Sequence, residues 1–265
     1  MSQREPNLDE LRRVVGICAD SNTVLVGGMA VVITAASVGV GATTDCVTRD
    51  ADFFGNSMAA QLAADRLELA GYQPKLFLAS LDDPHTPNSA KISVVISPEV
   101  FPVEIDFLAR INDLSSDEIG LTAVNIRIDG KDLRVEHPML IMENKIGNLS
   151  AWTNKRTTAG VEQARVSVAV LNAHLSKVGD DPQSQRKLLS AIERVGRLSQ
   201  RDGACFVYHT FGIDVLDAVP AKRVQSPEFH NIRWPQIQSE TQAIREKFAR
   251  LHKIKPDTNP RRFKL

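Results

Sequence analysis

Apolar residues at the start of the chain recur at two different spacings, which predicts helices interleaved with short strands. Segments with an apolar residue every three or four positions are typical of helices that bury one face. Short segments rich in Val, Leu and Phe are typical of buried strands, and glycine follows each of them here. The predicted elements are a helix at Leu8–Ala19, a strand at Val24–Val26, a helix at Met29–Val38, a strand at Val47–Phe54 and a helix at Ser57–Gly71, with Gly71 as its C-cap.

Strand patterns dominate the middle of the chain. Several short segments rich in Val, Ile and Phe are separated by Asp, Pro and Asn residues that favour turns. The pair Asp129-Gly130 is typical of a tight hairpin turn between two such segments. The predicted strands are Lys75–Ala79, Ala90–Ile96, Val100–Ile111, Val124–Ile128 and Leu133–Glu136.

Beyond His137-Pro138 the apolar spacing becomes helical and stays so. Because the central strands follow one another without helices between them, the order predicts an α+β fold with a mixed sheet, followed by a helical C-terminal domain. We place the domains at residues 1–145 and 146–265, the second ending in a basic, loosely ordered tail from Lys253. The predicted helices are Pro138–Leu149, Ala159–Leu175, Pro182–Leu198, Ala204–Leu216 and Trp234–Leu251.

Composition excludes several classes of protein. With 265 residues, 43% hydrophobic and 24% charged, the chain is neither fibrous nor disordered. The weakly charged stretch Val24–Thr44 contains glycine, threonine and serine, which favours a buried strand and helix over a membrane span. The first residues lack the apolar run of a signal peptide. Cys18, Cys46 and Cys205 have no CxxC spacing, so we expect reduced thiols in a cytoplasmic protein with no membrane partner.

Charge is distributed unevenly although the formal net charge is zero. Residues 1–150 hold 12 Lys and Arg against 21 Asp and Glu, whereas the remainder holds 20 basic and 11 acidic residues. This asymmetry suggests an acidic, metal-binding first half and a second half that faces phosphates. Two oppositely charged surfaces that attract each other explain the same numbers equally well.

Acidic residues recur at alternate positions in two predicted strands. Asp50 and Asp52 project from one face of the first strand, and Glu104 and Asp106 from one face of the second. Like charges held this close repel each other unless a cation lies between them, and carboxylate oxygens suit Mg²⁺. The alternative interpretation is a pair of strands whose acids simply face solvent. The apolar pair Phe53-Phe54 follows at once and implies a largely buried strand whose acidic edge opens on a cleft, which favours the metal site.

The glycine pair Gly27-Gly28 stands between a predicted strand and a predicted helix. Glycine allows a sharp turn there, and the unpaired N–H groups at the start of the helix can bind a phosphate. A simple turn is the alternative, since such pairs are common in proteins.

Taken together, the Gly-Gly turn, the Asp50-Ala51-Asp52 strand and the later strand with Asp106 resemble the nucleotidyltransferase superfamily related to DNA polymerase β. The string from His137 to Leu149 resembles the AbiE-type toxin nucleotidyltransferases. The resemblance implies that the three aspartates are catalytic and bind metal, that Gly27 and Gly28 cradle the triphosphate, and that Lys145 offsets charge on the pyrophosphate.

The expected function is therefore Mg²⁺-dependent transfer of NMP from an NTP such as ATP to an acceptor hydroxyl. The AbiE-type resemblance implies an RNA acceptor, particularly tRNA, a role as a toxin, and an antitoxin protein as partner; a small molecule or a protein hydroxyl stays open as the acceptor. Met29 follows Gly28 where the superfamily commonly has serine, so a catalytically degenerate module that binds nucleotide or protein is the alternative. A sugar-nucleotide glycosyltransferase, which also uses DxD, is a weaker third hypothesis because the expected regular alternation of strands and helices is absent.

Overall fold

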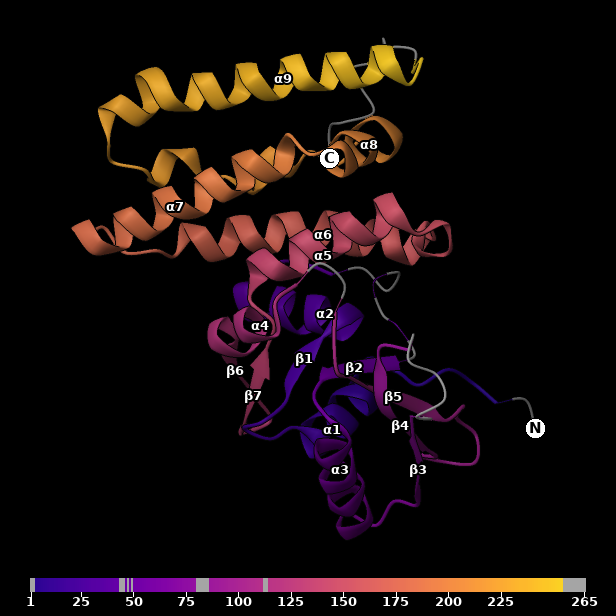
Figure 1. Ribbon diagram of the computed structural model, residues 1–265. Coiled ribbons are helices and arrows are strands. Elements are labelled where there is room, and N and C mark those ends of the chain that lie inside the picture. The colour runs from indigo at the N-terminus through magenta and orange to yellow at the C-terminus, as the bar shows by residue number, and fades with distance from the viewer. Residues whose placement is uncertain are drawn as a thin grey trace. The chain divides into compact units, whose positions relative to one another are not determined.

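The computed structural model describes residues 3–42, 46, 48, 50–79, 86–111 and 114–254 (Figure 1). The chain divides into two compact units. The first comprises Met1–Ser37 and Ala42–Ile141, and the second comprises Val38–Gly41 and Met142–Leu265.

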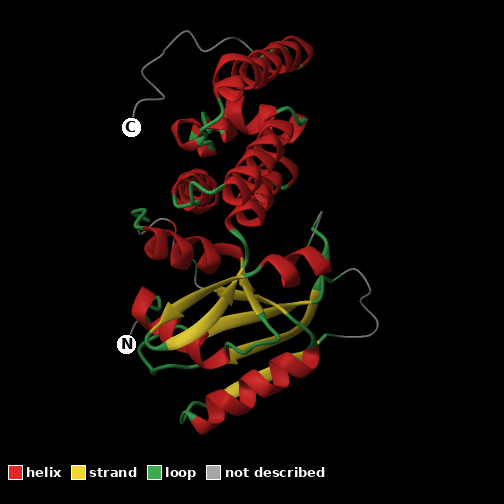
Figure 2. Ribbon diagram, turned by 90° about the vertical axis from the view of Figure 1, so that its left-hand side faces the viewer, coloured by secondary structure: helices red, strands yellow, loops and turns green. Residues whose placement is uncertain are grey.

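A mixed sheet of seven strands forms the centre of the first unit, as Figure 2 shows in yellow. The strand order is β3-β4-β5-β2-β1-β7-β6. β2 runs parallel to β5 and β1 runs parallel to β7, whereas the other neighbours are antiparallel. The strands are β1 (Val24–Val26), β2 (Asp50–Phe54), β3 (Pro74–Leu78), β4 (Asn88–Val94), β5 (Val103–Leu108), β6 (Val124–Ile128) and β7 (Lys131–Val135).

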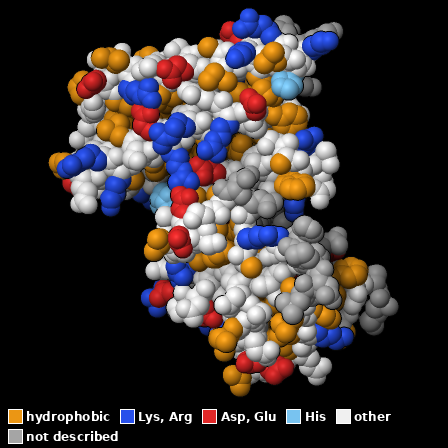
Figure 3. Space-filling view, viewed as in Figure 1, with side chains coloured by type: hydrophobic (Ala, Val, Ile, Leu, Met, Phe, Trp, Pro, Cys, Tyr) orange, Lys and Arg blue, Asp and Glu red, His pale blue; other side chains and the backbone are white. Residues whose placement is uncertain are grey.

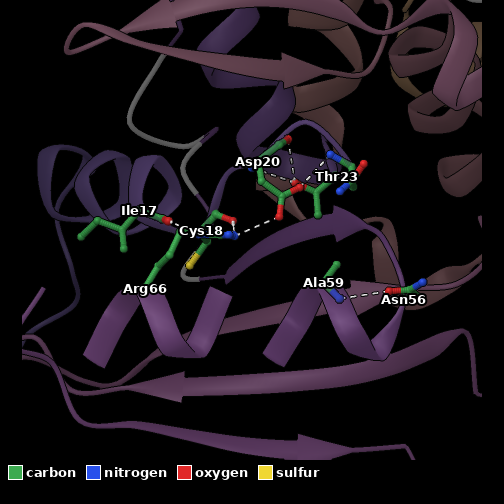
Figure 4. Close-up of polar contacts among 8 residues, drawn as sticks. Ile17, Cys18, Asp20, Thr23, Asn56, Ala59 and Arg66 are labelled. Carbon is green, nitrogen blue, oxygen red and sulfur yellow. Dashed lines mark hydrogen bonds and ion pairs between the residues drawn. The ribbon is translucent and has the colours of Figure 1, made fainter. Parts of the chain in front are cut away.

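One face of this sheet is apolar and packs against helix α3 (Ser57–Leu69), which contacts α1 (Leu8–Cys18). Phe53 of β2 and Phe107 of β5 are fully buried and stack with their ring centroids 5.6 Å apart. Arg66 of α3 joins the two helices: its guanidinium donates to the carbonyls of Ile17 and Cys18 at the end of α1 (Figure 4). Because these carbonyls have no partner within α1, the contacts fix where α1 ends against the sheet.

The opposite face of the sheet is apolar at one end only. Val24 and Val26 form a buried cluster there with Ile119 of α4 (Ser116–Thr122) and Leu140 at the start of α5 (Pro138–Ala151). Helix α2 (Gly27–Val38) follows β1 directly, and all its residues from Gly28 to Ala35 are buried. Away from this apolar cluster, the same face of the sheet carries polar residues on β2 and β5.

The second unit is helical. Its longer helices are α6 (Thr158–Ser176), α7 (Pro182–Ser199), α8 (Asp202–Phe211) and α9 (Trp234–Leu251). The short helix η2 (Thr153–Lys155) precedes α6, and η3 (Val215–Ala218), η4 (Ala221–Arg223) and the π-helical η5 (Phe229–Arg233) lie between α8 and α9. Several basic side chains here are paired with acids, including Arg194 with Glu143 and Arg233 with Glu193. On the face seen in Figure 3, positive and negative side chains are accordingly interspersed over this unit.

The α+β prediction is confirmed, and most predicted elements lie within a few residues of the observed ones. Strand β5 begins only at Val103, because Pro102 has no N–H to donate to a ladder. The predicted strand Val47–Phe54 is observed from Asp50; Val47 lies outside the described residues. The predicted helix Ala204–Leu216 was wrong in its second half: α8 ends at Phe211, where Gly212 adopts a φ of 65°. Residues 255–265 of the predicted tail also lie outside the described part of the chain.

Helix α4 was not predicted, although the sequence contains a signal for it. The Ser115 hydroxyl accepts a hydrogen bond from the Glu118 amide, as an N-cap does. The Ser-x-x-Glu spacing is thus a helix start within a segment otherwise treated as a connection.

The described helices include none that is long and apolar enough to cross a membrane. Cys18, Cys46 and Cys205 are buried and form no disulfide with one another.

Candidate functional site

Four carboxylates lie on the polar face of two neighbouring strands. The parallel register of β2 and β5 pairs Asp50 with Glu104 and Asp52 with Asp106. Directly opposed residues in a sheet share a face, and the residues between them, such as Ala51 and Ile105, are fully buried on the other side. All four acidic side chains are half-buried. The structure thus brings together the acidic residues of two strands that are distant in the sequence.

The carboxylate of Asp52 lies over the start of α2. The antiparallel register of β1 and β2 pairs Asp52 with Val26, the last residue of β1, so Asp52 adjoins the strand-to-helix junction. A Cβ added to Gly27 would be 2.0 Å from Asp52 Oδ2, a distance that two atoms cannot share. Gly27 also has a φ of 72°, which side-chain-bearing residues rarely adopt. Two independent constraints therefore require glycine at position 27.

Gly28, the second predicted glycine, is buried in the first turn of α2, and Met29 after it is fully buried. No hydroxyl therefore stands at position 29 to meet a phosphate. Lys145, the predicted pyrophosphate-facing lysine, lies on α5 in the helical unit and is half-buried. The sheet unit by itself therefore contains five of the six predicted site residues.

Strand β4 presents three hydrogen-bond donors to the acids of β5. Lys91 Nζ lies 2.8 Å from Glu104 Oε2, and the Ser93 hydroxyl donates to Glu104 Oε1 at 2.8 Å. The Asn88 amide donates to Asp106 Oδ1 at 3.0 Å. The pKa of Lys91 is raised, chiefly by its hydrogen bond to Glu104 and further by the charges of Asp106, Glu104 and Asp50, while burial opposes the shift. The ammonium group of Lys91 is therefore firmly protonated beside the acidic face.

The donor chemistry of this face fits a divalent cation, because carboxylate oxygens are the ligands that Mg²⁺ prefers. Gly27 lies so close to the Asp52 carboxylate that no side chain fits between them, so the site is crowded at this point. Within the described part of the chain, however, no three His, Cys, Asp or Glu side chains are disposed to hold one metal ion. In the arrangement observed, Asn88 and Lys91 instead bind the β5 acids.

Sequence reasoning missed the contribution of β4. Lys91 and Ser93 lie in the predicted strand Ala90–Ile96, whereas Asn88 precedes it and is the first residue of the observed β4. The polar positions in the alternation of this strand are visible in the sequence. Nothing in that pattern, however, indicates that β4 pairs with β5. The bulge between Asn88 and Ala90 further changes the alternation, so that the Asn88 side chain reaches Asp106.

Comparison with known proteins gives partial similarities. No family model matches the sequence. The Zn(2)-C6 fungal-type transcription factor FTF1a of Fusarium oxysporum f. sp. lycopersici is 32% identical over 118 residues, which are 43% of this chain and 10% of that protein. The chain therefore spans only a small part of the curated relatives that it matches.

Two solved structures are also similar. The structure of JHP933 from Helicobacter pylori has 12% sequence identity and a TM-score of 0.37, with 91% of each chain covered. The Megavirus polyadenylate synthase has 16% identity and a TM-score of 0.40, with 80% of this chain and 46% of that chain covered. Similarity at this level does not assign a family or an activity to the present chain.

Proposed function

We propose that this chain is a nucleotidyltransferase, which transfers NMP from an NTP to an acceptor hydroxyl at the polar face of β2 and β5. One observation carries the proposal: Asp52 and Asp106 are paired across parallel strands, and Asp52 lies against Gly27 where α2 begins. Acidic oxygens for a cation and helix N–H groups for a phosphate thus occur at one place, which nucleotidyl transfer requires.

In this proposal each residue of the site has a separate role. Asp50, Asp52 and Asp106 would hold Mg²⁺, which when bound would offset the charge of the triphosphate. Asp106 would also orient the acceptor hydroxyl. As the hydroxyl oxygen bonds to the α-phosphorus, the bond to the bridging oxygen breaks, pyrophosphate leaves, and the hydroxyl proton passes to a carboxylate of the site. Gly27 and Gly28 would offer backbone N–H groups to the phosphates.

The finer points of the proposal derive from the resemblance to the AbiE-type enzymes. ATP or another NTP would be the donor, and RNA, particularly the 3′ end of a tRNA, would be the acceptor. Lys145 would offset charge on the leaving pyrophosphate. The protein would then act as a cytoplasmic toxin controlled by an antitoxin partner.

The test is transfer of label from α-labelled NTPs, supplied one at a time with Mg²⁺ and total RNA. Asp52→Asn should abolish transfer, because it removes a charged oxygen ligand at the centre of the site. Asp132→Asn is the matched control: Asp132 is an exposed aspartate on β7, and its replacement should leave transfer unchanged. Equal inertness of the wild type and Asp52→Asn with every nucleotide and acceptor would refute the proposal.

A second candidate is a catalytically degenerate module that binds nucleotide or a protein. Two observations favour it: among the described residues no group of three acidic, His or Cys side chains could hold one metal ion, and Met29 supplies no hydroxyl after the glycine pair. Titration calorimetry separates the two functions. If calorimetry detects NTP binding and no product forms at saturating Mg²⁺, the result supports the degenerate module.

A further inference from the structure

We infer that the solvent-facing side of α7 binds the sugar–phosphate backbone of RNA through a basic stripe formed by Arg186, Lys187 and Arg197. The inference deepens the proposed function and rests on it for its partner, since RNA is the acceptor in that proposal. The stripe lies in the helical unit and acts by charge and hydrogen bonding, so it requires no metal ion.

The stripe follows from the amphipathic pattern of α7. Leu188, Ile192 and Val195 are fully buried and recur at intervals of three or four residues, so they form the face that packs into the helical unit. At about 3.6 residues per turn, the basic residues lie on the opposite side of the helix axis. A helix rises about 1.5 Å per residue, so the stripe from 186 to 197 is roughly 17 Å long.

The acids beside the stripe are already paired with other arginines. Arg194 of α7 donates to both carboxylate oxygens of Glu143, and Arg233 of η5 donates to both oxygens of Glu193. The pKa of Glu193 is lowered, chiefly by its hydrogen bond to Arg233 and further by the charges of Arg233 and Arg197, while burial opposes the shift. The positive charge of the stripe therefore exceeds the unpaired negative charge around it.

The side chains of the stripe are accessible to a ligand. Arg186, Lys187 and Arg197 are all exposed, and none of them forms an ion pair with another residue that the structure describes. Arg186 donates through Nε to the carbonyl of Pro182 at 3.3 Å. That contact leaves the two terminal amino groups of its guanidinium group available for an acceptor.

One end of the stripe borders an open hollow of about 460 Å³. The described residues that line it are Gln183, Arg186, Lys187 and Ser190. All four side chains are exposed, and each carries a hydrogen-bond donor. Phosphate oxygens accept hydrogen bonds and attract cations, so a phosphodiester group matches this lining in both respects.

A linear polyanion fits this surface better than a single nucleotide does. The cations extend over several turns of α7, and a nucleic acid strand presents its phosphates in a row. Helix α7 contains no aromatic residue on which a base could stack. The contacts we infer therefore go to the backbone, which carries no sequence information.

The experiment measures the binding of labelled tRNA and labelled oligouridine to the full chain by fluorescence anisotropy, at several salt concentrations and without Mg²⁺ or NTP. Arg186→Gln combined with Lys187→Gln removes two charges of the stripe, whereas Arg186→Lys combined with Lys187→Arg keeps them. Lys247→Gln combined with Arg250→Gln is the matched control, because it removes one lysine and one arginine from exposed positions of α9 in the same unit. Thermal unfolding establishes that each variant is folded.

We expect the glutamine variant of the stripe to bind both RNAs at least about tenfold more weakly than the wild type at about 50 mM salt. Its affinity should also depend less steeply on salt, with a log–log slope smaller by about 1.5, the loss of two phosphate contacts. The charge-keeping variant and the α9 control should bind as the wild type does. Unchanged binding by the folded glutamine variant overturns the inference, and so does equal weakening in the α9 control or a loss confined to one of the two RNAs.

Failure of the inference is distinguishable from failure of the proposed function. If the wild type transfers NMP to RNA and the glutamine variant binds RNA as well as the wild type does, only the role of α7 is wrong. If the wild type transfers no NMP but the glutamine variant binds RNA more weakly, the role of α7 is supported and the transfer reaction is what fails. If the wild type binds neither RNA, the inference is wrong whatever the result of the transfer assay.

Discussion

Replacement of Gly27 by alanine tests whether the contact between this residue and Asp52 organises the site. Gly27 has a φ of 72°, and its missing Cβ would lie 2.0 Å from Asp52 Oδ2. Gly71, after the end of α3 in the same unit, has a φ of 89° with no atom within 4 Å of the corresponding position. The two variants therefore share the backbone strain, and only Gly27→Ala adds a collision with a carboxylate.

This difference determines the losses of stability and of function that we expect for the two variants. An alanine in the left-handed region costs about 1–2 kcal/mol, which is the whole effect expected for Gly71→Ala. In Gly27→Ala the Asp52 side chain can rotate away from the new methyl group, so the additional loss of stability should be only about 1 kcal/mol. The displaced carboxylate, in contrast, should weaken divalent-cation binding and NMP transfer at least about tenfold.

Urea unfolding gives the two free energies of unfolding, and Mn²⁺ binding with label transfer gives the functional loss. We expect Gly71→Ala to lose stability but keep cation binding and transfer at the wild-type level. If the two alanine variants bind Mn²⁺ and transfer label equally well, glycine at position 27 is not needed to keep Asp52 in place. The site as we describe it would then be wrong.

Three further predictions concern the sheet unit. The Thr34 hydroxyl is buried with no hydrogen-bond partner in the described structure, so Thr34→Val should stabilise the protein by about 1 kcal/mol in urea unfolding; a loss of stability would imply a partner. Glu10 has its pKa lowered to about 2, chiefly by its hydrogen bond to Arg4, so its contribution is complete above about pH 4.5 and is lost as the pH falls toward 2. Glu10→Gln should accordingly be less stable than the wild type at pH 6, and the difference between their unfolding free energies should shrink by pH 2; a constant difference would contradict the assignment. Phe107→Ala removes the partner of Phe53 in the core and should cost about 3–5 kcal/mol in the same assay, whereas a cost below about 1 kcal/mol would show that the two rings do not form a close-packed core.

Much of the fold was predictable because its signals are local. The capping residues and spacing of α1, the Asp129-Gly130 turn with positive φ at both residues, and the Gly71 helix end depend only on neighbouring residues. Local signals were insufficient at Gly212, where a helical apolar pattern continues past the true end of α8. They were also overlooked at α4, which the Ser115 cap begins.

The same distinction between local and tertiary information applies to the candidate site. The sequence by itself determined that Asp50 and Asp52 share one strand face and that Glu104 and Asp106 share another, because side chains alternate with a period of two in any strand. Which strands become neighbours depends on how the whole sheet buries its apolar face, a matter of contacts between distant segments. Only the tertiary structure therefore decided that β5 lies between β2 and β4, and with it that Lys91 faces the acids.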